Sequence, residues 1–139
     1  MMEPIYGLPP VFLGPTADIL PLAGEVNWGM EAFQVERIRE ATGSLRVKLG
    51  VVDTGVDDAH PILTNVKGSR DFTGSRHGPR DVQGHGTHCT ATVGGTDPRI
   101  GVAAGYDLYH GKGLGDSGTG GSGLYRAIEY CLSEGCEVV

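Results

Sequence analysis

A short apolar segment that stops at a carboxylate constrains the fold of this chain more than any other feature. Residues 46–52 read Arg-Val-Lys-Leu-Gly-Val-Val, and Asp53, Thr54 and Gly55 follow directly. A strand that is apolar on both faces is typical of the interior of a parallel sheet, because helices cover both of its sides. In such folds, ligands and catalytic groups collect at the carboxyl ends of the strands. The segment therefore predicts an α/β fold with a mostly parallel sheet and a functional group at Asp53.

Three helical patterns surround this strand and support the α/β class. Asn27 can cap a helix that continues to about Thr42, and a second helix is expected to begin at His85. We expect a third helix to be capped by Ser122 and to end at Gly135. The apolar face of the first helix is predicted from Met30, Phe33, Ile38 and Ala41, and that of the third from Leu124, Ala127, Ile128, Cys131 and Leu132.

The remaining segments complete the expected organisation. A weak strand is predicted over residues 107–112, a glycine-rich loop over 113–121, and a further apolar strand from Val138. Residues 57–83 are polar and are expected to be irregular. Residues 1–25 are rich in proline and glycine, so we interpret them as an N-terminal arm or leader that precedes one domain at 26–139.

Composition excludes several classes of protein. The net charge of −6 comes with no clustered basic stretch, so no nucleic-acid partner is expected. No apolar run approaches the ~20 residues of a membrane span, so no membrane partner is expected either. The first residues lack the basic start and apolar core of a signal peptide, and the sequence indicates no particular compartment. The three cysteines have neither disulfide-framework nor zinc-site spacing, and we expect no metal or other cofactor.

Asp53 and His85 are the candidate catalytic residues. A histidine can act as a general base when a carboxylate fixes its tautomer and stabilises the imidazolium that forms. An aspartate at the end of a strand can be held rigidly, and a histidine in the first turn of a helix feels the positive end of the helix dipole. The dipole should resist protonation of His85. Gly84 and Gly86 flank this histidine and allow the backbone to pack tightly.

The segments around both residues resemble a known family. Residues 51–57, Val-Val-Asp-Thr-Gly-Val-Asp, resemble the aspartate motif of the subtilisin-like serine proteases. Residues 84–89, Gly-His-Gly-Thr-His-Cys, resemble their histidine motif in its cysteine-bearing, proteinase K-like form. The resemblance covers roughly residues 26–139. It implies the N-terminal half of a three-layer α/β subtilisin-like catalytic domain that hydrolyses peptide bonds through an Asp-His-Ser triad.

The family's nucleophile is the main departure from this resemblance. None of the six serines stands in the Gly-Thr-Ser context of that nucleophile, and the Asn that donates to the oxyanion is also missing. The resemblance therefore implies a Ser supplied by a second chain or by a C-terminal segment, and we expect this chain alone to be inactive. The alternative is a non-catalytic pseudoprotease or peptide-binding fragment. A calcium site of the family is also expected to be absent, because Ile62 stands where many members have Asp.

The loop at 113–121 is the candidate substrate-binding segment. In the resemblance, Gly118, Thr119 and Gly120 present backbone that pairs with an extended peptide, and Leu114 lines a subsite beside His85. The same loop contains Ser117 in a Gly-Asp-Ser-Gly sequence, and residues 113–118 satisfy G-x-G-x-x-G. We consider a Ser117 nucleophile and a dinucleotide site as weaker alternatives. His88 is expected to have a structural hydrogen-bonding role.

Overall fold

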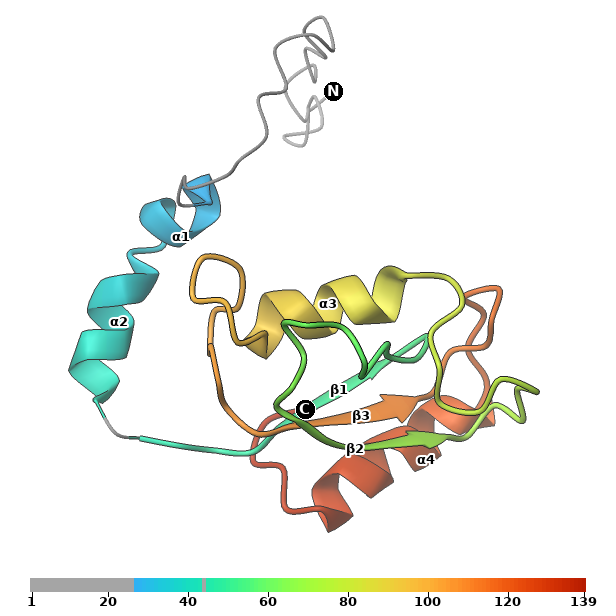
Figure 1. The fold of residues 1–139 in the computed structure, drawn as a ribbon. Helices are drawn as coiled ribbons and strands as arrows, with labels where there is room; N and C mark the ends of the chain where they lie inside the picture. Colours follow the sequence, from blue (N-terminus) through green and yellow to red (C-terminus); the bar gives the residue numbers. More distant parts are fainter. Residues whose placement is uncertain (1–26, 44) are drawn as a thin grey trace, which may run out of the picture.

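A parallel sheet between two helices forms the centre of the molecule (Figure 1). The computed structural model describes residues 27–43 and 45–139, so the expected arm at 1–25 lies outside the described residues. No helix of these described ranges is long and apolar enough to cross a membrane. The elements in chain order are α1 (Trp28–Ala32), α2 (Val35–Thr42), β1 (Leu49–Asp53), β2 (Val66–Asp71), α3 (His85–Gly94), β3 (Leu108–Lys112) and α4 (Ser122–Ser133).

The sheet order is β1-β3-β2, and both pairings are parallel. Helix α3 lies on one face against β1 and β3, and α4 lies on the other face against all three strands (Figure 1). The α/β class, the parallel sheet and the three layers predicted from the sequence are therefore confirmed. Leu49 also forms a parallel bridge with Val138, so the predicted additional strand begins at the free edge of β1.

Strand β2 contradicts the expectation that residues 57–83 are irregular. Its sequence, Val-Lys-Gly-Ser-Arg-Asp, has no buried apolar face, and none of its residues is fully buried. An edge strand can be polar because only one of its sides pairs with the sheet. The hydrogen bonds with β3 define this strand, and they are not visible in the hydrophobic pattern.

Strand β3 lies at the centre of the sheet, although its sequence predicts only a weak strand. Leu108 is fully buried in the core with Leu49, Val56, Leu63 and Ala91. His110 and Lys112 are fully buried as well. Their burial explains why apolar periodicity underestimates this strand: two of its inward side chains are polar and have specific partners.

The predicted helix over 27–42 is divided into α1 and α2, and the expectation of one continuous helix was wrong. Asn27 does cap α1, since its side chain accepts a hydrogen bond from the Gly29 amide at 2.9 Å. Gln34, however, adopts a left-handed conformation with φ 51°, which breaks the helix before Val35. Val35 and Met30 are buried, whereas Phe33 and Ile38 are exposed. The break therefore changes which apolar side chains face the protein.

Ser122 does not occupy the expected capping position of α4. Gly121 is at the N-cap, and Ser122 is the first residue of the helix. The predicted end is close to the observed one, since Glu134 is the C-cap and Gly135 follows with φ 83°. The predicted and observed starts of the helix differ by one residue. The buried residues of α4 are Gly123, Ala127 and Cys131.

Arg39 on α2 connects the N-terminal helices to the loop that follows α3. Its guanidinium donates to the backbone carbonyls of Val102 at 3.1 Å and Pro98 at 3.0 Å, and also to that of Gly101. In the same loop, the Asp97 carboxylate accepts two hydrogen bonds from the Arg99 guanidinium and one from the Arg99 amide. The oxygen atoms of this loop thus face two guanidinium groups. These residues do not fit a calcium ion, which needs six or more oxygen ligands free to coordinate it.

We predict that Arg39→Ala will lower the free energy of unfolding by about 2 kcal/mol, because several backbone carbonyls lose a charged donor. Urea unfolding at neutral pH measures the change. Arg37→Ala is the matched control, since this exposed arginine of the same helix bonds only Gln34 among the described residues and should change stability by about 0.5 kcal/mol or less. Equal effects of the two substitutions would contradict the role assigned to Arg39.

Candidate active site

The Asp53 carboxylate lies at the carboxyl end of β1 and is buried. Its Oδ1 atom accepts hydrogen bonds from the Thr54 amide at 2.7 Å and faces Nδ1 of His85 at 2.8 Å. Its backbone carbonyl accepts from the amides of Gly113 and Leu114, which begin the glycine-rich loop. Both the side chain and the backbone of Asp53 are therefore fixed, which is the rigid placement that the sequence predicted.

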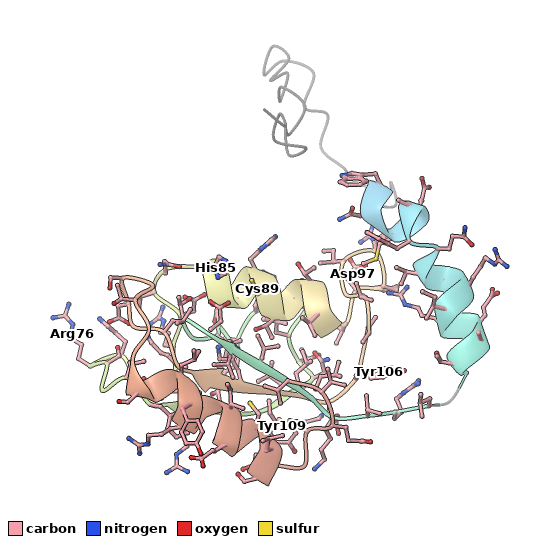
Figure 2. All side chains as sticks on the ribbon, turned by 180° about the vertical axis from the view of Figure 1, so that it is seen from behind. Arg76, His85, Cys89, Asp97, Tyr106 and Tyr109 are labelled. Atoms are coloured by element: carbon pink, nitrogen blue, oxygen red, sulfur yellow. The ribbon has the colours of Figure 1, made fainter. Side chains whose placement is uncertain are left out.

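His85 is the first residue of α3, and its side chain is 60% exposed. Because Nδ1 faces Asp53, the other ring nitrogen, Nε2, does not contact this carboxylate, and it lies 3.8 Å from the Cys89 sulfur. His85 and Cys89 lie on successive turns at the beginning of α3 (Figure 2). The sequence thus brings together a histidine and a carboxylate 32 residues apart in the geometry of a general base and its orienting group.

Electrostatics of the pair favour the charged forms of both residues. The hydrogen bond and charge of Asp53 raise the pKa of His85 above its ordinary value. Burial disfavours ionisation of Asp53, but the hydrogen bonds from His85 and Thr54 outweigh it and lower the pKa of Asp53. The expected resistance of His85 to protonation at the helix N-terminus is thus outweighed, because a full negative charge in contact exceeds the partial charge of the dipole.

Asp81 is a further residue of the site, and it was not identified from the sequence. Its carboxylate accepts hydrogen bonds from the Thr87 amide and hydroxyl at 2.8 and 2.7 Å and from the Thr54 hydroxyl at 3.1 Å. It also accepts from the amides of Gln83 and Gly84. The Thr54 hydroxyl in turn accepts from the Gly86 amide at 3.0 Å. Asp81 therefore joins the residue after Asp53 to the first turn of α3.

The position of Asp81 in the sequence carried a usable signal. An acidic residue shortly before a helix can accept hydrogen bonds from the unpaired amides of its first turn, and Asp81 lies four residues before His85. The intervening turn hides this role, because Gly84 has a left-handed conformation with φ 95° and has no side chain that can cap. Only the folded turn brings the carboxylate over the helix start.

Two glycines allow β1 and α3 to approach so closely. A Cβ atom at Gly86 would overlap the backbone of Gly55 and Thr54, and Gly55 has φ 119°. Gly55 also lies against the backbone of Pro79 and Arg80. Any larger side chain at Gly86 would separate Asp53 from His85, so the glycine is required for their 2.8 Å contact.

Asp53, His85 and Cys89 form a group in which one ligand atom from each lies within 4.8 Å of the others. To bind a metal ion, these three residues would have to give up contacts with one another, because Nδ1 of His85 already contacts Oδ1 of Asp53. The Cys89 sulfur lies 3.7 Å from the same nitrogen. Burial and the charge of Asp53 raise the pKa of Cys89, which disfavours its thiolate form. The group fits an acid–base pair better than a metal centre.

His88 does not show the structural hydrogen bond expected for it. It is exposed on α3, and its ring has no hydrogen bond to any of the described residues. His110 was left without a role by the sequence, yet it is fully buried beneath α3 and its Nδ1 atom lies 3.0 Å from the Thr90 hydroxyl. Burial lowers the pKa of His110 to about 4, so this ring is neutral at physiological pH.

The glycine-rich loop is folded back on itself next to Asp53. Leu114 forms an antiparallel bridge with Gly120, and the Gly115 amide donates to the carbonyl of Thr119 at 2.9 Å. Gly118 has φ 80° and lies close to the side chain of Gln83, which comes shortly before His85. Leu114, Gly118, Thr119 and Gly120 thus lie on one loop beside the carboxyl end of the sheet. Their role in binding a peptide stays a prediction.

The two alternative interpretations of this loop gain no support from the geometry. The Ser117 hydroxyl pairs with the Thr119 hydroxyl at 2.9 Å, and no hydrogen bond joins it to His85 within the described residues. The G-x-G-x-x-G glycines lie on a closed loop, and α4 begins only at Ser122. A dinucleotide site needs the last of these glycines at the start of the helix, so that the helix N-terminus can face the phosphates.

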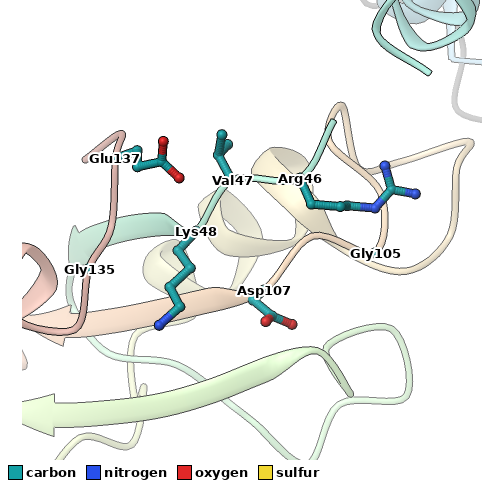
Figure 3. Close-up of a pocket in the computed structure, with 7 residues that line it drawn as sticks. All are labelled: Arg46, Val47, Lys48, Gly105, Asp107, Gly135 and Glu137. Atoms are coloured by element: carbon teal, nitrogen blue, oxygen red, sulfur yellow. The ribbon is translucent and has the colours of Figure 1, made fainter. Parts of the chain in front are cut away.

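A polar pocket at the other end of the sheet is distinct from this site (Figure 3). Its lining includes Arg46, Lys48, Asp107 and Glu137, which lie near the amino ends of β1 and β3. Lys48 donates to the carbonyl of Glu134 at 2.9 Å, which holds its ammonium in the protein. In parallel α/β sheets, functional sites form at the carboxyl ends. The Asp53–His85 pair is therefore the stronger candidate.

Comparison with known proteins gives one consistent family. Residues 45–139 match the subtilase family, Peptidase_S8. The chain is 35% identical over 128 residues to an alkaline protease of Shouchella clausii, covering 88% of this chain and 33% of that protein. It is 36% identical over 122 residues to subtilisin Savinase of Lederbergia lenta, covering 84% of this chain and 44% of that protein.

Subtilisin E of Bacillus subtilis (strain 168) is a further relative, 38% identical over 124 residues. That match covers 84% of this chain and 32% of subtilisin E. The chain thus spans about a third to under half of the length of these curated relatives.

We predict that Asp53→Asn will lower the pKa of His85 toward the ordinary value of about 6.5, because the neutral amide removes the charge that favours the imidazolium. Titration of the His85 ring signals by NMR measures the change. Asp58→Asn provides the control, since Asp58 is exposed and has no hydrogen bond to His85. An unchanged His85 titration in Asp53→Asn would show that the two side chains are not paired in solution.

The second prediction of the site concerns Asp81 and acid stability. Burial disfavours its ionisation, but the donors from Thr87, Gly84 and Gln83 dominate and lower its pKa to about 2. A lowered folded-state pKa stabilises the protein above the ordinary value near 4, and the stabilisation is lost as the pH falls toward 2. Asp81→Asn should therefore lower the free energy of unfolding by about 2 kcal/mol at neutral pH, and by much less at pH 2. Urea unfolding at neutral pH and at pH 2 measures this difference. An equal loss of the free energy of unfolding at the two pH values would contradict the prediction.

Proposed function

The chain belongs to the subtilase family, and we propose that it supplies the aspartate and histidine of a serine endopeptidase. The observation that carries this proposal is the 2.8 Å contact between Asp53 Oδ1 and His85 Nδ1, which leaves Nε2 available to a nucleophile. The reaction class is acyl transfer to water through an Asp-His-Ser triad. The family membership supports a serine-type peptidase in general, and the roles of individual residues are part of the proposal.

In the proposed mechanism, Nε2 of His85 takes the proton of a serine hydroxyl as that hydroxyl attacks a peptide carbonyl. The imidazolium that forms is stabilised by the Asp53 carboxylate, and it then gives its proton to the leaving amine. The raised pKa of His85 is consistent with this stabilisation. Asp53 stays ionised throughout, because its hydrogen bonds keep its pKa low.

The nucleophile is proposed to come from sequence outside these residues. None of the six serines has the sequence context of the family's nucleophile, and the relatives are more than twice as long as the segment matched. A second chain or a C-terminal segment can join at β1, because the Gly50 amide already donates to the carbonyl of Val138 at 2.8 Å. Continued strand pairing along this edge would bring the partner's side chains to the carboxyl end where Asp53 lies.

The substrate is proposed to be an extended peptide or protein segment that pairs with the 113–121 loop. Gly118, Thr119 and Gly120 form the outer part of the loop, and Leu114 is half-buried next to Asp53. An extended peptide satisfies its backbone amides and carbonyls by pairing with such a segment. The glycines leave room for the peptide's side chains, so the loop constrains the backbone of the substrate more than its sequence.

A thiol mechanism is the competing chemistry at the same histidine, since Cys89 lies 3.7 Å from the ring. The raised pKa of Cys89 disfavours it, because the thiolate is the nucleophilic form. The competing function is a non-catalytic, peptide-binding pseudoprotease, which would keep the loop and need no nucleophile. The two candidates differ in one observable, covalent reaction with a serine-directed probe.

We predict that a chimera in which this chain replaces the aligned segment of subtilisin Savinase will hydrolyse peptides and react with a fluorophosphonate probe. The chain alone should do neither, because it lacks the nucleophile. In the chimera, His85→Ala should lower kcat by about four orders of magnitude or more, since base and nucleophile act as one unit. Peptide hydrolysis and probe labelling, followed by gel fluorescence, measure both effects.

Two control variants separate the proposed mechanism from its competitors. Cys89→Ser should keep most of the activity, and His88→Ala should keep kcat because His88 is exposed and the Asp53–His85 contact does not involve it. Loss of all activity in Cys89→Ser would favour thiol chemistry. A chimera that unfolds cooperatively on heating yet remains unlabelled by the probe would favour the non-catalytic function.

A further inference from the structure

Lys112 is a buried charge that the proposed mechanism does not use. It is the last residue of β3, and its side chain is completely inaccessible to solvent. Its ammonium donates to the carbonyl of Arg80 at 2.8 Å and to Oδ1 of Asp116 at 2.6 Å. A buried ammonium is costly unless it is paired and hydrogen-bonded, so these two contacts are the condition for its presence.

The two partners of Lys112 belong to different segments at the carboxyl edge of the sheet. Asp116 lies on the 113–121 loop, and both of its carboxylate oxygens also accept from the Ser75 hydroxyl, at 3.0 and 2.9 Å. Arg80 directly precedes Asp81 and forms a bridge with Val56. The ammonium therefore connects the proposed peptide-binding loop with Arg80. The next residue, Asp81, holds the start of α3 through its hydrogen bonds from Thr87.

The strand register places this connection next to the candidate active site. Lys112 is the partner of Asp53 across the β1–β3 pair. The backbone carbonyl of Asp53 accepts from the two residues that follow Lys112, Gly113 and Leu114. Backbone hydrogen bonds fix only this first part of the loop to the sheet, and the ion pair with Asp116 fixes its next part.

We propose that Lys112 is a positioning residue of the peptide groove, which sets the loop of Gly118, Thr119 and Gly120 relative to His85 through its ion pair with Asp116. The proposal rests on the proposed function of that loop and adds a residue that determines its geometry. An apolar side chain of similar length could fill the same space. It could not form the ion pair that orients Asp116 or the hydrogen bond to the carbonyl of Arg80. Lys112 thus affects the binding of extended peptides more than the chemistry at His85.

The first test uses the full chain and needs no catalysis. Lys112→Met should increase the amide hydrogen exchange of Gly115 and Gly118, whose amides donate within the loop, by about tenfold or more. Exchange in β1 should change far less. Lys67→Met is the matched control, because Lys67 is half-exposed on β2 and lies 3.7 Å from Asp107, outside the loop. Unchanged protection of Gly115 and Gly118 in Lys112→Met would overturn the proposal.

A second variant covers the case in which Lys112→Met does not fold. Asp116→Asn keeps the side-chain shape but removes the negative partner, and Asp116 is 37% exposed, so the substitution is tolerated more easily. It should increase exchange at the same two loop amides, with the same Lys67→Met control. No effect on the loop amides in a folded Asp116→Asn chain would also overturn the proposal.

The third measurement separates positioning from general stability in the active chimera. Lys112→Met should lower kcat/KM for a tetrapeptide amide about tenfold through KM, and should change kcat for a single-residue ester less than about threefold. Equal losses for both substrates would indicate a structural role and overturn the proposal. A chimera inactive even with Lys112 intact would refute the proposed function. The positioning role of Lys112 would still be decided by hydrogen exchange at Gly115 and Gly118, because a peptide-binding pseudoprotease keeps the same loop.

Discussion

The hydrogen bond between Asp53 and His85 is the constraint on which the described architecture depends. It joins the end of β1 to the start of α3 at 2.8 Å, so strand and helix must approach to backbone contact. Gly55 and Gly86 make that approach possible, and Asp81 holds it by accepting hydrogen bonds from Thr54 and Thr87. The proposed catalytic pair therefore depends on how a strand end and a helix start pack against each other.

The carboxyl edge of the sheet contains several charged groups whose burial would be unfavourable without hydrogen-bond partners. Asp53, Asp81 and Lys112 are all wholly or partly buried there, and each has several hydrogen-bond partners from different segments. Such a network fixes relative positions because each lost partner leaves a buried polar group unsatisfied. The amino edge, by contrast, carries a polar pocket in which three of the four charged lining residues are exposed (Figure 3). The two edges thus differ in how fully their charged groups are hydrogen-bonded, and the more fully bonded edge carries the candidate site.

Residues distant from the candidate site contact the elements that carry it. Arg39 holds the loop after α3 through backbone carbonyls, and α3 carries His85 at its other end. On the opposite face, α4 packs on all three strands through small residues such as Ala127, which is fully buried. Several apolar side chains on the outer side of α4 and at Val138 and Val139 are exposed in the chain.

The sequence by itself determined the α/β class, the strand ending at Asp53 and the helix starting at His85, because each has a local pattern of residue types. The pairing of Asp53 with His85 was implied by the resemblance of their two motifs to the subtilisin-like family. The sequence did not reveal β2, the break at Gln34, Asp81 or Lys112. Strand β2 and Lys112 depend on hydrogen bonds to segments tens of residues away, which leave no periodic pattern in the chain. The break at Gln34 depends on a left-handed backbone angle at a residue that rarely adopts one. Only the tertiary structure decides such features, since a polar side chain reads as solvent-exposed until its partner is brought next to it.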